Sequence, residues 1–233
     1  MKMSSTIDKR IRTLFPDAAP FEQVLEGYFQ LMTQAHGLDV DQTIAAVSLC
    51  PDELNNPVIE KIRELFGHVF HLGGLTGYPF TGETGFNAFG DHIPDAGTAF
   101  IFFGPHLGIT ENSLGYVHRP GQARDTLSCG AAFGAYQMLL NGQQLGTEQQ
   151  ADDYQQTRVR QMLAPKLDTI PRHQPELALL NILFEESHAF VVSQSTRIKE
   201  RFQAEQIILL GAMILNTPLD MPDYLQVKYF EAL

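Results

Sequence analysis

Three short, nearly continuous apolar segments constrain the fold more than any other feature of this sequence. They span residues 43–50 (TIAAVSLC), 68–75 (HVFHLGGL) and 97–106 (GTAFIFFGPH), and they are rich in residues that favour strands. A strand without polar alternation has both faces covered, as in a parallel sheet between two layers of helices. The sequence therefore predicts an α/β fold with a mainly parallel sheet at its core and helices on its flanks.

The segment between the first two predicted strands, residues 51–66, has the pattern of a helix. Its apolar residues recur at intervals of three and four, Asp52 can serve as the N-cap, and Gly67 can end the helix. A helix between two buried strands forms a βαβ unit. The first two strands are therefore expected to run parallel in one sheet.

Apolar spacing predicts further helices on both sides of this glycine-rich middle. They cover residues 20–36 and 174–202, and another helix opens at Cys129. Residues 204–215 fit either a late strand or a buried helix, and we favour a strand for residues 207–210.

One domain accounts for the whole chain. Its 233 residues, of which 44% are hydrophobic, are enough for a single α/β core. We expect this domain to span residues 1–233, with helical additions over about residues 1–40 and about residues 147–203.

Charge and hydropathy exclude two classes of partner. The chain has 27 acidic and 16 basic residues, and its net charge of -11 creates no field that would attract nucleic acid. No window approaches the about 18 apolar residues of a membrane span, and the first residues lack the apolar stretch of a secretory signal. We therefore expect neither nucleic acid nor membrane as a partner. The expected location is the cytoplasm, or an organelle stroma if a transit peptide has been removed.

Side chains that can bind a metal follow the predicted strands. Cys50 and His106 close two of the apolar segments, and Cys129 stands at the start of the next helix. Because ligands gather at the carboxyl ends of parallel strands, these side chains can meet there. Two thiolates and an imidazole are a zinc ligand set, and three protein ligands leave a fourth position open, as in catalytic sites. A plainer interpretation stays open, in which the cysteines are small buried apolar residues and the histidine is a hydrogen-bonded core residue.

Five segments follow one another in a fixed order across the middle of the chain. They are C-P-D-E-L-N (50–55), H-L-G-G-L-T-G-Y-P-F-T-G-E-T-G-F (71–86), F-G-P-H-L-G-I (103–109), R-P-G-Q (119–122) and S-C-G-A (128–131). Together they resemble the limiting-CO2-inducible protein B family and its bacterial relatives, a group of β-type-like (theta) carbonic anhydrases. The resemblance implies a β-carbonic-anhydrase-like fold and the reversible hydration of CO2 to bicarbonate. It also implies a homodimer, because related sites lie at subunit interfaces.

By this resemblance, Cys50, His106 and Cys129 bind Zn²⁺, and Asp52 is the acidic member of an Asp–Arg dyad beside the metal. Two thiolates and a neutral imidazole balance the charge of zinc and leave a Lewis acid. Asp52 can accept a hydrogen bond at the site or occupy the fourth zinc position itself. Which of these it does depends on an arginine that holds it.

That arginine is where this chain departs from the family. The family pattern C-R-D-E has arginine directly after the first cysteine, and this chain has Pro51. Arg119, in R-P-G-Q, is the first choice to hold Asp52 instead. Arg124 is the alternative, and Arg63 lies too far along the predicted helix. The sequence thus predicts Asp52 and Arg119 as catalytic residues and a weak activity, against plainer roles as an N-cap and a loop-stabilising arginine.

Residues 73–90 contain six glycines in 18 residues, which predicts a loop rather than a helix or a strand. No Gly-Lys-Ser/Thr follows, so this is not a phosphate loop. We expect the loop to form the wall of a small apolar pocket for an uncharged linear substrate. The candidate lining residues are Leu75, Tyr78, Phe80 and Phe86. His71 and His92 are candidate proton shuttles, with an ordinary structural role as the alternative.

Three functions compete at this point. The leading one is a zinc lyase that interconverts CO2 and bicarbonate. The second is a catalytically silent zinc-binding member of the same fold that acts in binding or protein interaction, which Pro51 favours. The third is a cysteine hydrolase that uses Cys50 or Cys129 with His106, and zinc bound to both thiols would exclude it.

Overall fold

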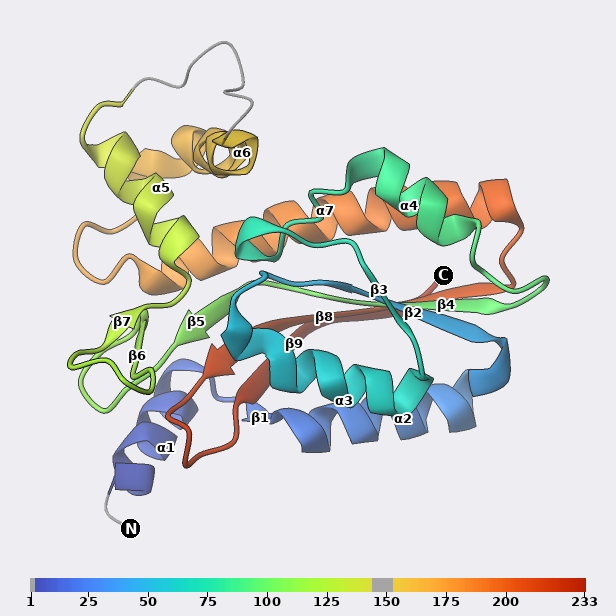
Figure 1. The fold of residues 1–233 in the computed structure, drawn as a ribbon, viewed down its shortest axis with the longest axis horizontal. Coiled ribbons are helices and arrows are strands. Elements are labelled where there is room, and N and C mark those ends of the chain that lie inside the picture. The colour runs from blue at the N-terminus through green and yellow to red at the C-terminus, as the bar shows by residue number, and fades with distance from the viewer. Residues whose placement is uncertain (1–2, 144–152) are drawn as a thin grey trace.

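The structure is a computed structural model that describes residues 3–143 and 153–233, and a seven-stranded sheet forms its centre (Figure 1). The strand order is β1-β9-β8-β4-β2-β3, with β5 paired to the far end of β8. β3, β2, β4 and β8 run parallel, and β9 is antiparallel to β8. The strands are β1 (Ala19–Pro20), β2 (Thr43–Ser48), β3 (Val69–His71), β4 (Thr98–Phe103), β5 (His106–Gly108), β8 (Gln206–Asn216) and β9 (Tyr224–Ala232).

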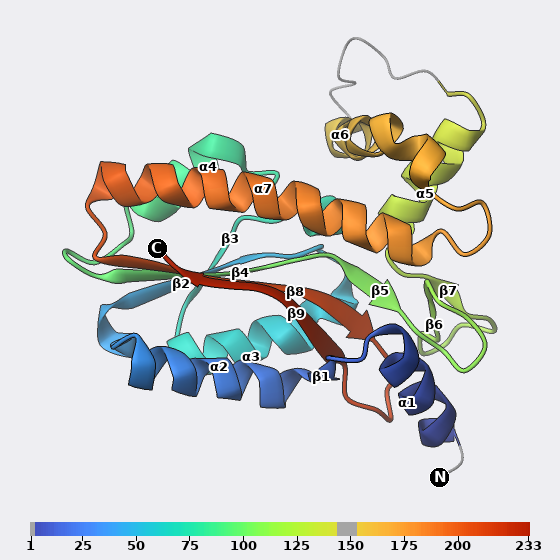
Figure 2. The same ribbon diagram turned by 180° about the vertical axis from the view of Figure 1, so that it is seen from behind.

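Helices cover both faces of this sheet, as the two opposite views in Figures 1 and 2 show. α2 and α3 lie on one face, and α7 lies on the other face with α4 beside it. The helices are α1 (Met3–Leu14), α2 (Phe21–Ala35), α3 (Asn56–Phe66), α4 (Gly82–Gly90), α5 (Gly130–Leu140), α6 (Tyr154–Leu163) and α7 (Glu176–Phe202). A separate two-stranded ribbon consists of β6 (Tyr116–Val117) and β7 (Thr126–Leu127).

The side chains of β4 show why the strands lack polar alternation. Phe100 and Phe102 belong to the core cluster on the side of α2 and α3, whereas Ile101 and Phe103 belong to the cluster on the side of α7. Each of the four is at most 1% exposed. The predicted α/β fold with a mainly parallel sheet covered on both faces is therefore confirmed.

The helix predicted for residues 51–66 begins later than expected. A 3-10 turn occupies Glu53–Asn55, and α3 starts at Asn56. Asp52 accepts a hydrogen bond from the Leu54 N–H at 3.2 Å, so it caps this turn and not the α-helix. The predicted end is confirmed, because Gly67 follows α3 with a φ of 78°, which favours glycine.

Two other predictions about secondary structure differ from the structure: a predicted strand is confirmed but longer than expected, and a predicted loop contains a helix. The strand expected at residues 207–210 extends over Gln206–Asn216, since β4, β5 and β9 give it hydrogen-bonding partners along its length. The glycine-rich segment 73–90 contains a helix, α4. Its last residue, Gly90, lies against the Phe202 ring at the end of α7, where a Cβ atom would clash. Close approach of two helices therefore offsets the entropy that glycine costs.

Both segments expected as helical additions contain helices. α1 and α2 lie within residues 1–40, and α6 and α7 lie within residues 147–203, of which 147–152 are outside the described residues.

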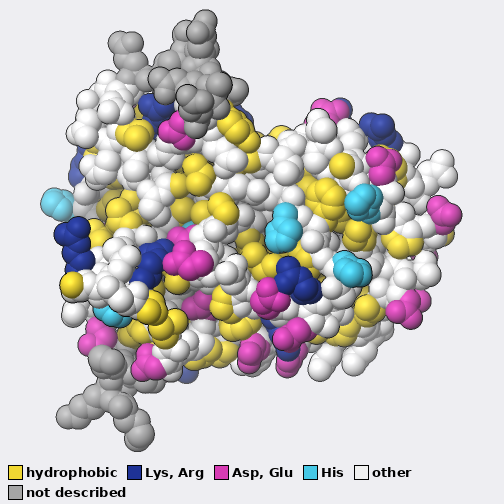
Figure 3. Space-filling view, in the orientation of Figure 1, with side chains coloured by type: hydrophobic (Ala, Val, Ile, Leu, Met, Phe, Trp, Pro, Cys, Tyr) yellow, Lys and Arg dark blue, Asp and Glu magenta, His cyan; other side chains and the backbone are white. Residues whose placement is uncertain are grey.

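No helix in the described ranges is long and apolar enough to cross a membrane. Acidic, basic and apolar side chains are interspersed on the face shown in Figure 3.

Candidate metal centre

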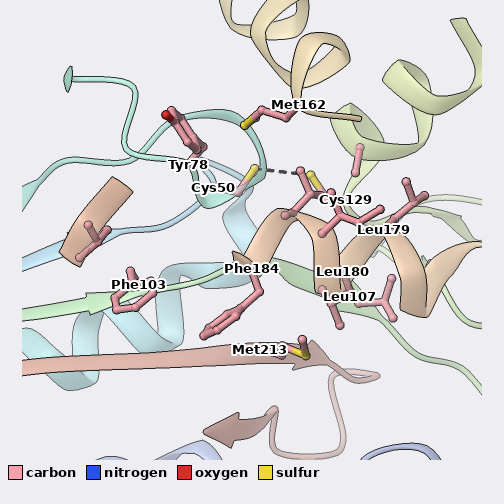
Figure 4. Close-up of a cluster of buried hydrophobic side chains, with 14 of the residues drawn as sticks. Cys50, Tyr78, Phe103, Leu107, Cys129, Met162, Leu179, Leu180, Phe184 and Met213 are labelled. Atoms are coloured by element: carbon pink, nitrogen blue, oxygen red, sulfur yellow. Dashed lines mark hydrogen bonds between the residues drawn. The ribbon is translucent and has the colours of Figure 1, made fainter. Parts of the chain in front are cut away.

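Two thiols and one imidazole meet beyond the carboxyl ends of β2 and β4. The Sγ atoms of Cys50 and Cys129 are 3.8 Å apart (Figure 4). The possible ligand atoms of these two residues and of His106 all lie within 4.8 Å of one another, and all three side chains are buried. The predicted convergence of the three residues is therefore confirmed.

Each of these residues is positioned by the end of a different element. Cys50 follows β2 by two residues, His106 is the first residue of β5, and Cys129 precedes α5 as its N-cap residue. β2 and β4 pair in parallel along their full lengths, so the chain leaves both strands at the same edge of the sheet. Asn55 donates a hydrogen bond to the carbonyl of Cys50 at 3.0 Å and stabilises the turn that follows β2.

The two thiols differ in their tendency to ionise. The hydrogen bond with Cys129, together with burial, raises the pKa of Cys50 above its usual range. The same hydrogen bond lowers the pKa of Cys129, and the backbone N–H groups of Ala131 and Ala132 at the start of α5 add to this effect. The start of α5 therefore favours the thiolate form of Cys129.

The two nitrogens of His106 have different surroundings. Nδ1 lies 2.8 Å from Asn216 Oδ1 and 3.2 Å from Ser128 Oγ. Nε2 is buried, has no hydrogen-bond partner among the described residues, and lies 3.9 Å from Asp52 Oδ2. Burial opposes protonation of the ring, but the interactions with Cys50, Asn216 and Asp52 outweigh it and raise the pKa of His106.

This donor set fits a metal ion with three protein ligands. Tetrahedral coordination with metal–sulfur bonds of about 2.3 Å separates two sulfur atoms by about 3.8 Å. The separation between Cys50 and Cys129 is 3.8 Å. The buried His106 Nε2 needs a partner that the described residues do not supply, and a metal ion would provide it.

Asp52 lies beside the three residues and is held by Arg119. Arg119 Nη2 donates to both carboxylate oxygens of Asp52, at 3.1 and 3.0 Å, and its Nε donates to Glu53 at 2.6 Å. The contact with Arg119 lowers the pKa of Glu53. Burial disfavours the charge on Arg119, but the contacts with both carboxylates outweigh burial and raise its pKa. One guanidinium thus bridges two neighbouring carboxylates.

Two contacts fix the other side of the Arg119 guanidinium to β7. Its Nη1 donates to Thr126 Oγ1 at 2.7 Å and to the carbonyl of Leu127 at 3.4 Å. Of the other two arginines considered from the sequence, Arg124 is exposed, and Arg63 forms an ion pair with Glu60 within α3. Arg119 is therefore the arginine of these three that contacts Asp52.

The four apolar residues predicted to line a substrate pocket belong to the buried cluster that contains Cys50 and Cys129 or pack against it. Tyr78 and Phe86 are buried members of the cluster, and Leu75 and Phe80 pack against it. The Tyr78 ring lies 5.1 Å from that of Phe80. Phe86 is fully buried against Phe190 of α7, with 6.0 Å between the ring centroids.

The two candidate proton shuttles, His71 and His92, are exposed. His92 packs edge-on against Phe70 of β3 at 5.6 Å. Sequence reasoning missed three polar residues around the site. Ser128 and Asn216 are buried, and Asp223 is partly buried. A signal for Asn216 was present, because this residue directly follows the apolar segment 204–215.

A family model matches most of the chain. The model for limiting CO2-inducible proteins B/C beta carbonic anhydrases matches residues 19–233. The chain belongs to this family. The match includes the three candidate ligands, Asp52 and Arg119. The family resemblance seen in the sequence is therefore confirmed.

Solved structures of the family have the same fold. PtLCIB4, a homolog of the limiting CO2-inducible protein LCIB, is 31% identical, with 95% of this chain and 93% of that chain covered and a TM-score of 0.83. A PtLCIB4 variant is 30% identical, with coverages of 97% and 94% and a TM-score of 0.85. LCIB itself is 16% identical, with coverages of 96% and 93% and a TM-score of 0.72, which supports the fold alone. No curated protein matches the chain.

Proposed function

We propose that this family member is a zinc-dependent carbonic anhydrase that interconverts CO2 and bicarbonate. The observation that carries the proposal is the buried set of Cys50, His106 and Cys129 beside an Asp52 that Arg119 holds. Two thiolates and an imidazole favour zinc over hard cations such as magnesium, which prefer oxygen ligands. Zinc supplies, when bound, a Lewis acid that lowers the pKa of a coordinated water toward about 7 and so provides the nucleophile for CO2.

Asp52 has two roles open to it, and Arg119 selects between them. One Asp52 oxygen is 3.9 Å from His106 Nε2, so the carboxylate is near enough to the candidate ligands to become a ligand itself. Arg119 donates to both oxygens and opposes such a movement. Held in this way, Asp52 would accept a hydrogen bond from a water at the site and orient it toward the substrate.

The apolar side of the site fits the substrate. CO2 is uncharged and linear, so its recognition needs shape and desolvation more than hydrogen bonds. Leu75, Tyr78, Phe80 and Phe86 are the proposed lining, and Tyr78 lies in the same buried cluster as the two cysteines (Figure 4). His71 and His92 remain candidates for proton transfer to solvent.

A catalytically silent zinc-binding protein is the second candidate, and Pro51 is the observation that favours it. Proline has neither the charge nor the N–H donors of the family arginine. Of Arg63, Arg119 and Arg124, only Arg119 holds the Asp52 carboxylate in place. In this alternative, Asp52 closes the metal site, and the protein acts through binding. We further propose a homodimer and a reducing compartment such as the cytoplasm, in which both thiols stay free for zinc.

Zinc content and CO2 hydration, measured on the same sample, test the proposal. Protein purified without added metal should contain about one zinc per chain, because the three ligands are already assembled. The double variant Cys50→Ala/Cys129→Ala should lose both zinc and hydration. Zinc far below one equivalent in the wild type, or full retention in the double variant, would reject the metal assignment. Full zinc without hydration would favour the silent alternative, and hydrolase activity in zinc-free protein would favour the cysteine hydrolase.

A further inference from the structure

A buried asparagine joins the candidate ligand His106 to the end of β8. Asn216 is the last residue of β8 and is fully buried. Its Oδ1 faces His106 Nδ1 at 2.8 Å. Its Nδ2 donates to the carbonyl of Leu54 at 3.3 Å and to Asp223 Oδ2 at 3.1 Å. All polar atoms of this amide are therefore satisfied within the protein.

The neighbours of Asn216 determine which way its amide points. A backbone carbonyl can only accept a hydrogen bond, so the atom that faces Leu54 O must be the NH₂ group. The amide oxygen is then the atom that faces His106, and an amide oxygen can only accept. His106 Nδ1 must therefore carry the proton, which leaves the lone pair of the neutral ring on Nε2.

Asp223 keeps this amide in place. Its Oδ2 accepts from Asn216, and its Oδ1 accepts from the backbone N–H of Thr217 at 2.8 Å. The backbone carbonyl of Asn216 in turn accepts from the N–H of Ile109 at 2.8 Å, just after β5. Both the amide and the backbone of Asn216 are thus held, and rotation of the amide away from His106 would break the hydrogen bonds to Leu54 and Asp223.

We propose that Asn216 is a positioning residue that fixes His106 as the Nδ1-protonated tautomer and aims its Nε2 at the metal. The proposal rests on the proposed zinc site. A metal-bound histidine commonly donates its other ring N–H to a polar partner, and losing that partner typically weakens metal binding by about 10–100-fold. Asn216 plays this part here, and Asp223 supports it.

Ser128 cannot replace Asn216 in this role. Its Oγ is 3.2 Å from His106 Nδ1, and a hydroxyl can either donate or accept. It therefore adapts to either tautomer and selects neither. An unprotonated Nδ1, by contrast, would place its lone pair against the amide oxygen of Asn216.

Zinc affinity provides the first test, measured by competition with a chelator of known affinity. Asn216→Leu removes the acceptor at similar size and should weaken zinc binding by about 10–100-fold. Asn181→Leu is the matched control, because Asn181 is an exposed asparagine on α7 whose amide bonds only within its helix. The control should bind zinc within about twofold of the wild type. Equal affinity in folded Asn216→Leu would overturn the proposal.

A double variant separates positioning from simple loss of stability. Compared with Asn216→Leu, the pair Asn216→Asp/Asp223→Asn restores an acceptor for His106 Nδ1 and a hydrogen bond between positions 216 and 223, while the donor to the Leu54 carbonyl is lost. It should bind zinc more tightly than Asn216→Leu, whereas Asp223→Leu, which removes the support, should weaken binding. A double variant no better than Asn216→Leu would contradict the positioning role.

The tautomer itself can be read in the metal-free protein by ¹⁵N nuclear magnetic resonance of labelled histidine, with His106→Gln to assign the signal. We expect the proton on Nδ1 in the wild type and a shift toward the Nε2-protonated form in Asn216→Leu. A proton on Nε2 in the wild type would overturn the inference even if zinc binds. If zinc does not bind, the proposed function fails, and this measurement still decides the role of Asn216.

Discussion

Two histidines, the buried His106 and the partly buried His188, each have a buried Nε2 without a hydrogen-bond partner among the described residues, and their surroundings shift the pKa of the ring in opposite directions. At the carboxyl end of the sheet, the polar and ionisable neighbours of His106 outweigh burial and raise its pKa. On α7, burial lowers the pKa of His188. An unpartnered buried nitrogen is thus no sign of a metal site by itself. The neighbours decide, because only His106 has two thiols within reach.

The region around His188 is built from rings. Its imidazole stacks on Phe103 and Phe184, with centroids 6.1 and 6.0 Å away, and meets Tyr229 of β9 at 4.2 Å. These contacts tie α7 to the sheet through apolar surface. The His106 region instead uses directional hydrogen bonds from the ring to Asn216 and Ser128. The first region should tolerate a ring of similar shape, and the second should be sensitive to the loss of the acceptor at Asn216.

Replacing each of the two histidines in turn should give the largest difference in zinc affinity. His106→Ala should weaken zinc binding by at least about 100-fold, since zinc binding of about 10–16 kcal/mol is shared among few ligands. His188→Phe keeps an aromatic ring and should bind zinc within about twofold of the wild type. Chelator competition measures both. Equal zinc affinity in His106→Ala and the wild type would show that His106 is not a zinc ligand.

Removing the arginine that holds Asp52 should have the next largest effect. Arg119→Ala and Arg119→Lys should each lower CO2 hydration by about 100-fold with zinc content intact. The reason is that misplacing an orienting group by about 1 Å can lower the rate about 100-fold. Lysine keeps the charge but cannot contact Asp52 and Glu53 with one planar group. Arg124→Ala, at an exposed arginine of the same segment, is the control. Native-like turnover in both Arg119 variants would eliminate the orienting role.

The sequence predicted the three candidate ligands for a simple physical reason. Chains leave parallel strands at one edge, so Cys50 and His106 had to lie near each other once their segments were recognised as strands. The βαβ pattern around residues 51–66 supported the same sheet. The contact between Arg119 and Asp52 came from weighing three arginines against the missing family arginine, and not from spacing alone.

The remaining features depended on contacts that no local pattern contains. Helix α4 packs closely against Phe202, more than 100 residues away, at Gly90, where a side chain would clash. Asn216 was missed because the strand that carries it was expected to end at residue 210. A longer strand would have placed Asn216 at the same carboxyl edge as Cys50 and His106. An error in the length of one element thus hid a residue of the site.

Restoring the family arginine should have a smaller effect than losing Arg119. Pro51 is exposed, and an added guanidinium beside Asp52 there contributes at most about 1 kcal/mol, or about fivefold in rate. Pro51→Arg should therefore raise CO2 hydration by up to about fivefold, and Pro51→Ala should not. Steady-state hydration at equal zinc content measures the change. An unchanged rate in folded, zinc-loaded Pro51→Arg would show that Arg119 already holds Asp52 fully.

The smallest expected effect is a pH dependence of stability from the ring-lined region. The pKa of His188 is lowered by burial from the ordinary histidine value of about 6.5, so the unfolded chain takes up this proton more readily than the folded protein. The contribution to stability is fully present above about pH 6.5 and is lost as the pH falls through the lower pKa of the folded state. Urea unfolding of metal-free wild type and His188→Phe, compared from pH 7.5 to 5, isolates this contribution because both proteins share every other titrating group. The stability of the variant should fall less than that of the wild type over this range. A parallel fall in both proteins would mean that the surrounding rings do not lower the pKa of His188 in the folded protein. The contrast with His106 would then lie in the thiols alone.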